Sequence, residues 1–179
     1  VFSNIGRDKN TIVECDLATR KEVKEIYANP DYDVDGLDYS EKRKVLTAAY
    51  YTSWKGEEHF LDKESEADYN KMKEKFKGYE IGIYGNNNAE DKFVVWTGND
   101  KVAAKYYYFD KKTGETKFLA DAFPWLKEEN MATMKPVEYK SRDGLTIHGY
   151  LTLPKGYEAK GLPVVINPHG GPWARDDWG

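Results

Sequence analysis

The sequence has 179 residues, 40% of them hydrophobic and 15% aromatic, which is enough for one domain or parts of two. The net charge is only −4 and Lys and Glu are mixed along the chain, so no long stretch of one sign is present, which argues against nucleic acid and membrane partners. Cys15 is the only cysteine, which excludes an internal disulfide and a cysteine-based metal cluster, and we expect no metal and no cofactor.

The residue types favour a fold that is mainly β, because Tyr, Val, Thr, Phe and Trp suit the pleated surface of a sheet. The chain begins with Val1-Phe2-Ser3-Asn4, which has the pattern of the middle of a strand, and it ends at Gly179 without a terminating helix or a polar tail. We therefore expect a piece of a longer protein. Its localisation stays open between the cytoplasm and the periplasm.

Three aspartates, 46 and then 48 residues apart, each follow a strand-like run and lead into a polar turn. They are Asp16, Asp62 and Asp110. Another apolar run and a short turn precede each of these runs, so each period carries a hairpin. A period of about 45 residues with several short strands is the size of one β-propeller blade, which must stack on neighbours to bury both faces. The alternative is an ordinary β-sandwich in which the spacing is a coincidence.

One segment departs from the β pattern, and we predict a helix over Lys63–Lys77 within a blade. Ser65 and Asp68 stand in capping-box positions, and Gly78 is the expected residue after the helix. The apolar face would carry Tyr69, Met72 and Phe76. Residues 120–135 end the repeat, and we predict a propeller part over 1–130 and a second domain over 131–179.

The second domain is predicted to open with a hairpin, with strands at Val137–Lys140 and Leu145–Leu153. The short apolar run Pro163–Asn167 then reads as a strand buried on both faces of a central sheet. Directly after it comes the loop His169-Gly170-Gly171-Pro172. Two glycines at the end of a strand let the backbone turn sharply and bring N–H groups to a ligand without a Cβ in the way.

The order and spacing of these C-terminal motifs resemble the opening of the hydrolase domain in the prolyl oligopeptidase family, closest to its acylaminoacyl-peptidase-like branch. The residues that carry the resemblance are Arg142–Pro154, His169-Gly170-Gly171-Pro172, Arg175-Asp176 and Trp178-Gly179. Family members place a β-propeller before this domain. The resemblance therefore implies a partial β-propeller of about three blade-like repeats, followed by the first strands of an α/β-hydrolase domain.

The resemblance also implies roles for the loop. Gly171 would donate its backbone N–H to the oxyanion of the tetrahedral intermediate, and Gly170 would shape the loop. The remaining motif residues would support the loop, with Arg175 and Asp176 as an ion pair and Trp178 packed beneath it; they are His169, Pro172, Arg175, Asp176 and Trp178. No sequence pattern places a carboxylate partner beside His59 or His148, and we expect both histidines to have structural rather than catalytic roles.

The catalytic residues of the family fall outside this sequence, because no Gly-x-Ser-x-Gly motif occurs in it. The resemblance implies a fragment of a serine peptidase that hydrolyses short peptides, inactive by itself because the nucleophile is absent. Two alternatives remain open, a non-catalytic propeller binding module and a carboxylesterase. The expected partners are a short peptide substrate in the full-length protein and a second copy, paired through exposed sheet edges.

Overall fold

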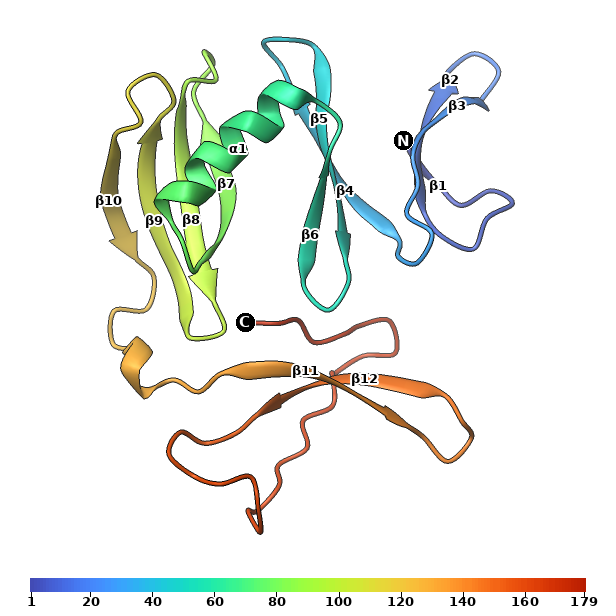
Figure 1. The fold of residues 1–179 in the computed structure, drawn as a ribbon. Coiled ribbons are helices and arrows are strands. Elements are labelled where there is room, and N and C mark those ends of the chain that lie inside the picture. The colour runs from blue at the N-terminus through green and yellow to red at the C-terminus, as the bar shows by residue number, and fades with distance from the viewer. The chain divides into compact units, whose positions relative to one another are not determined.

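The computed structural model describes residues 1–179 and consists mainly of antiparallel strands in four sheets (Figure 1). The first sheet has the order β1-β2-β3, with β1 at Phe2–Ser3, β2 at Thr11–Asp16 and β3 at Lys21–Tyr27. The second has the order β4-β5-β6, with β4 at Val34–Ser40, β5 at Val45–Thr52 and β6 at Gly56–Phe60. The helix α1 follows at Lys63–Lys75.

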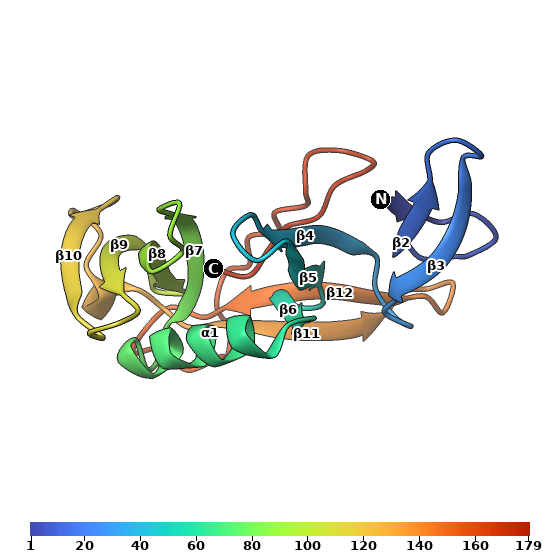
Figure 2. The same ribbon diagram turned by 90° about the horizontal axis from the view of Figure 1, so that it is seen from above.

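The third sheet has four strands in the order β10-β9-β8-β7, which lie side by side in Figure 2. Their bounds are β7 at Glu80–Asn86, β8 at Lys92–Asn99, β9 at Val102–Asp110 and β10 at Thr116–Asp121. A short 3-10 helix, η1, covers Glu128–Asn130. The fourth sheet is a hairpin of β11 at Met134–Lys140 and β12 at Thr146–Thr152. The mainly β fold and its open sheets confirm the prediction of part of a propeller.

The chain divides into two compact units, residues 1–72 with 87–90 and residues 73–86 with 91–179. In the first unit, Ile12, Val34 and Ala49 from three neighbouring strands form a core that is almost completely shielded from solvent. The N–H of Val34 donates to the carbonyl oxygen of Asn10 at 3.1 Å, which links the first two sheets. His59 stacks on Tyr27 with 4.1 Å between ring centroids, so its ring packs against the first sheet.

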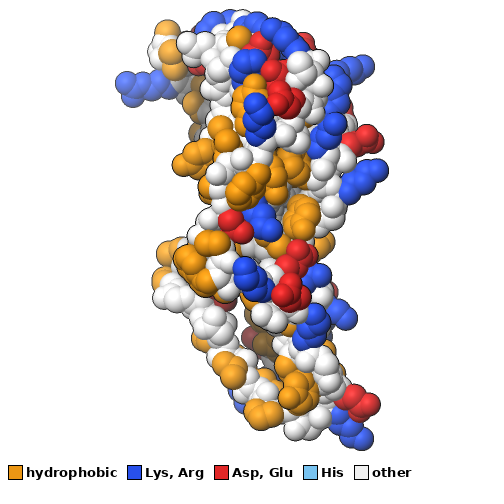
Figure 3. Space-filling model, turned by 90° about the vertical axis from the view of Figure 1, so that its left-hand side faces the viewer, with side chains coloured by type: hydrophobic (Ala, Val, Ile, Leu, Met, Phe, Trp, Pro, Cys, Tyr) orange, Lys and Arg blue, Asp and Glu red, His pale blue; other side chains and the backbone are white.

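In the second unit, one face of the four-stranded sheet carries the core residues Phe93, Val95 and Phe109. Phe93 and Phe109 are direct partners across β8 and β9. Alternate residues of β8 are buried because successive side chains of a strand point to opposite faces. The outer strand β10 is exposed along most of its length and has a register irregularity between Phe118 and Ala120. The face seen in Figure 3, which looks onto β10, carries hydrophobic side chains among lysines and acidic residues.

The repeated aspartates form the same kind of corner, as predicted. Asp16 ends β2 and accepts hydrogen bonds from the N–H groups of Ala18 and Thr19 at 2.8 and 2.7 Å. Asp110 ends β9 and accepts from the N–H groups of Lys112 and Thr113 at 2.9 and 3.1 Å. In both cases the side chain starts the turn that leads to the next strand.

Two of these corners also hold a cation from the strand or turn that lies beside them. Asp62 contacts Nη1 of Arg43 at 2.7 Å, and Asp110 contacts Nζ of Lys92 at 2.9 Å. The hydrogen bond from Lys92, together with the N–H donors of the turn, holds the pKa of Asp110 well below its usual range. After Asp110 the chain forms β10, whereas after Asp62 it forms α1, so the helix takes the place in chain order of a fourth strand.

A second repeat, which the sequence analysis missed, joins a glycine to an aromatic residue. Gly36 on β4 lies opposite Tyr50 on β5, and Gly82 on β7 lies opposite Trp96 on β8. Each glycine and each aromatic residue is 46 residues from its counterpart. A Cβ built on Gly36 would lie 2.9 Å from Cβ of Tyr50, and one on Gly82 would lie 2.1 Å from Nε1 of Trp96. The aromatic side chain therefore occupies the space above the glycine in both sheets.

The predicted helix is confirmed over Lys63–Lys75, two residues shorter than expected. Tyr69 and Met72 are buried, and the Tyr69 ring lies 5.1 Å from that of Phe60. The predicted capping box at Ser65 and Asp68 is wrong. Asp62 caps the helix instead, because its Oδ2 accepts a hydrogen bond from the N–H of Ser65 at 2.9 Å. Gly78 follows the helix with φ +90°, in the left-handed region that favours glycine. This 13-residue, charge-rich helix is neither long nor apolar enough to cross a membrane.

The C-terminal hairpin is confirmed and the strand predicted after it is not. β11 and β12 pair without a break from Met134 opposite Thr152 to Lys140 opposite Thr146. Residues 163–167 form no strand, and Val165, at their centre, is 92% exposed. A strand buried in a parallel sheet needs neighbours on both sides. None of the strands of this chain pairs with the segment. The predicted domain boundary between residues 130 and 131 stays a prediction.

Candidate functional site

The His169-Gly170-Gly171-Pro172 loop lies in the irregular segment that follows β12. Neither Gly170 nor Gly171 has a positive φ. A Cβ added to Gly170 would meet no atom of the chain within 4 Å, and one added to Gly171 would touch only Cβ of Ala174, at 3.5 Å. Contacts within this chain therefore do not require glycine at either position. The chain does bend at both glycines, in a backbone conformation that other residues can also adopt.

The backbone N–H of Gly171 has no hydrogen-bond acceptor in this chain. Gly171 is half-buried, whereas Gly170, His169 and Pro172 are exposed. The donor that the resemblance assigns to the oxyanion is thus free to bind another group. Its role in catalysis stays a prediction.

The end of the loop is held against the C-terminal hairpin by two contacts. Nη2 of Arg175 donates to the hydroxyl of Tyr150 on β12 at 3.3 Å, and Nε1 of Trp178 donates to the carbonyl oxygen of Met134 on β11 at 3.4 Å. The structure gives Arg175 an ion pair with Asp177, whose Oδ1 lies 3.6 Å from Nε. Asp176, the partner expected from the sequence, is exposed.

The hairpin also carries a histidine–carboxylate pair that sequence reasoning missed. Nδ1 of His148 lies 3.1 Å from Oε1 of Glu138. The two residues are direct partners in the β11–β12 register, so a register drawn from the predicted turn would have found them. Both side chains are largely exposed, which is typical of a surface pair.

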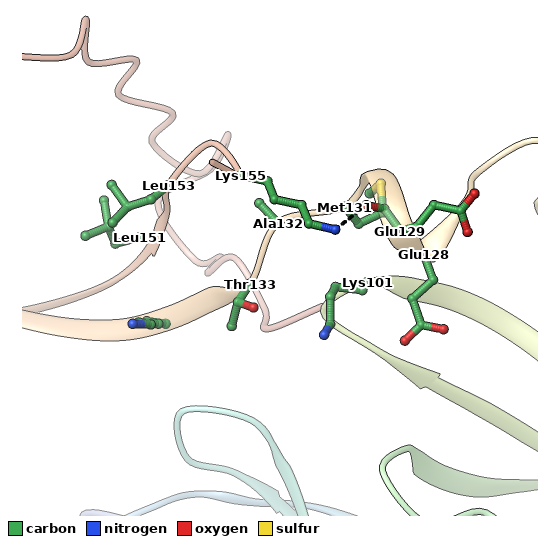
Figure 4. Close-up of a pocket in the computed structure, with 10 residues that line it drawn as sticks. Lys101, Glu128, Glu129, Met131, Ala132, Thr133, Leu151, Leu153 and Lys155 are labelled. Atoms are coloured by element: carbon green, nitrogen blue, oxygen red, sulfur yellow. Dashed lines mark hydrogen bonds between the residues drawn. The ribbon is translucent and has the colours of Figure 1, made fainter. Parts of the chain in front are cut away.

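A pocket of about 500 Å³ lies beside the hairpin, within the second unit (Figure 4). Its walls come from the β8–β9 turn, η1 and the segment after it, and both strands of the hairpin with the residues that follow. The lining residues are Lys101, Glu128, Glu129, Met131, Ala132, Thr133, Lys135, Leu151, Leu153 and Lys155. No sequence motif pointed to this pocket, because its walls come from segments far apart in the chain. Nowhere in the structure do three His, Cys, Asp or Glu side chains gather as metal ligands would.

Comparison with known proteins finds similarity both in sequence and in fold. The chain is 40% identical over 81 residues to dipeptidyl aminopeptidase BIII of Pseudoxanthomonas mexicana, a match over 41% of this chain and 12% of the relative. It aligns with a solved prolyl endopeptidase structure with a TM-score of 0.56 and 14% identity, over 88% of this chain and 23% of that one. No family model matches the sequence.

One of these matches concerns the fold of the chain and the other concerns its sequence. The likeness to the endopeptidase concerns the fold, and the sequence match adds similarity to an aminopeptidase. The chain spans only about an eighth of the curated relative, and the acylaminoacyl-peptidase-like branch stays a prediction. The sequence relative and the fold together support the predicted resemblance to the prolyl oligopeptidase family.

Proposed function

We propose that this chain is part of a serine peptidase that hydrolyses short peptides, and that Gly171 supplies one donor of its oxyanion hole. The observation that carries the proposal is the 40% identity to a dipeptidyl aminopeptidase, in a chain that also has the His169-Gly170-Gly171-Pro172 motif. The free N–H of Gly171 and the open space beside Gly170 support the assignment.

The chemistry requires a donor of this kind. When a serine attacks a peptide carbonyl, the carbonyl oxygen becomes negatively charged, and backbone N–H groups at hydrogen-bond distance stabilise that charge. Because this charge develops only in the transition state, the Gly171 N–H would stabilise the transition state more than the bound substrate, and its effect would fall on kcat rather than on KM.

The chain by itself hydrolyses no peptide, because it contains no Gly-x-Ser-x-Gly nucleophile motif. The oxyanion role is therefore tested in the longer protein that carries the nucleophile. We expect Gly171→Val to lower kcat by about 10² to 10³, with a smaller change in KM, because the branched side chain should displace the loop and move the N–H away from the oxyanion.

Gly170→Ala is the matched control, because it alters the same loop at a position with no neighbour within 4 Å. We expect it to keep most of the activity. A Gly171→Val protein that folds normally and retains kcat on a short peptide would show that the loop is only a turn. Hydrolysis of esters without hydrolysis of peptides by the longer protein would instead favour the carboxylesterase.

A further inference from the structure

The pocket beside the hairpin has the chemistry of an anion site on an apolar floor. Three lysines reach it from separate segments, Lys101 from the β8–β9 turn, Lys135 from β11 and Lys155 from beyond β12. None of the three ammonium groups forms an ion pair. Nζ of Lys155 donates to the backbone carbonyl oxygen of Glu129 at 2.5 Å, which fixes this lysine at the rim. Figure 4 shows the Lys101 and Lys155 side chains on either side of the segment that carries Thr133.

The acidic residues of the pocket limit how much negative charge a ligand can carry. Glu128 accepts a hydrogen bond from the hydroxyl of Tyr79 at 3.2 Å, which holds its carboxylate toward β7. The carboxylate of Glu129 points away from the Lys155 side chain in Figure 4. Three lysines and two glutamates leave one net positive charge on the lining. This balance suits a single carboxylate better than a doubly charged phosphate.

The rest of the lining is apolar and suits a hydrocarbon side chain. The apolar part of the lining comes from Met131, Ala132, Leu151 and Leu153. Leu151 lies directly opposite Lys135 in the hairpin register. A volume of about 500 Å³ falls within the range of small-molecule pockets, about 300 to 1,000 Å³. The ligand that fits therefore has one carboxylate next to an apolar group.

We propose that this pocket binds the C-terminal carboxylate of a short peptide whose last side chain is apolar. The carboxylate sits among Lys101, Lys135 and Lys155, and the side chain rests on Leu151 and Leu153. Gly171 is not among the residues that line this pocket, and the proposal is argued from the pocket alone. Binding of the peptide here therefore does not depend on the proposed peptidase activity, although a peptidase releases ligands of this class.

Binding is measured by titration calorimetry on the 179-residue chain, with N-acetyl-Leu-Leu as the free acid and as the C-terminal amide. We expect the acid to bind about tenfold more tightly than the amide, since the amide cannot form charge-assisted hydrogen bonds. Lys101→Met and Lys155→Met should each weaken binding of the acid by about tenfold, because methionine keeps the apolar stem without the charge.

Lys24→Met is the matched control, since Lys24 is an exposed lysine of β3 outside the pocket. It should leave the affinity unchanged. Equal affinity for acid and amide, or equal weakening by Lys24→Met, would overturn the proposal. Inorganic phosphate that displaces the acid at the same concentration would show a general anion site and overturn the peptide assignment. The acid and the amide are compared on the unsubstituted chain, so the proposal can still be tested if a variant fails to fold.

Discussion

Val95 in the third sheet and Val165 in the C-terminal segment are both valines, and each lies within an apolar run that predicts a strand. Val95 is completely buried and Val165 is 92% exposed. Val95 lies on β8 with β7 and β9 paired on either side, whereas residues 163–167 have no strand beside them. An apolar run thus indicates a tendency, and the strands on its two sides decide whether it is buried.

The largest effect on stability is expected from shortening a buried side chain. Met72→Ala removes a side chain that is fully shielded in α1 and leaves a cavity, which should cost about 2 to 5 kcal/mol of unfolding free energy. Val165→Ala removes atoms that already face solvent and should change it by less than about 0.5 kcal/mol. Urea unfolding followed by circular dichroism measures both. A Val165→Ala loss as large as that of Met72→Ala would mean that the C-terminal segment is packed in solution.

The next largest effect on stability is expected from adding a Cβ to a glycine that lies under an aromatic ring. Gly82→Ala puts a Cβ into the space of the Trp96 indole, and moving the ring should cost about 1 to 3 kcal/mol. Gly170→Ala meets nothing and should leave the stability of the chain unchanged. Thermal unfolding followed by tryptophan fluorescence distinguishes the two. If both variants unfold at the temperature of the original chain, the ring over Gly82 moves freely and does not constrain the sheet.

The smallest effect depends on pH. The folded pKa of Asp110 is depressed, so its carboxylate stabilises the fold above the unfolded pKa of about 3.9. This stabilisation is lost as pH falls through the folded pKa. Asp110→Asn should therefore lower Tm at pH 7 and flatten its decline below about pH 4, since the charge is absent throughout. Asp176→Asn, in the exposed C-terminal loop, is the control and should follow the original curve. Identical curves for all three proteins would show that the corner at Asp110 adds no stability.

The sheets could be predicted because their signals are local. An aspartate that starts a turn after a strand needs only its next three residues, and Asp16 and Asp110 both form the expected corner. The hairpin turn before β12 is equally local. The cap of α1 was predicted wrongly because Ser65, Asp68 and Asp62 are all capping residue types, and only the structure shows which one receives the N–H groups.

The candidate sites were less predictable because they depend on contacts between distant segments. The Arg175 contact with Tyr150 spans 25 residues and the Trp178 contact with Met134 spans 44. The pocket gathers residues from 101 to 155. A motif can name the residues of a loop, but it does not contain the geometry that brings them to a hairpin or a pocket.

The glycine–aromatic pairs have a consequence for how the strands find their partners. If β4 slipped by one residue against β5, Asp35 or Leu37 would replace Gly36 opposite Tyr50, and a side chain would meet the ring. A slip of β7 would put Ile81 or Ile83 opposite Trp96 in the same way. A one-residue slip also turns every side chain to the other face of the sheet. Each glycine thus marks the alignment in which the ring lies over a residue without a side chain, and a slipped hairpin would lose this arrangement.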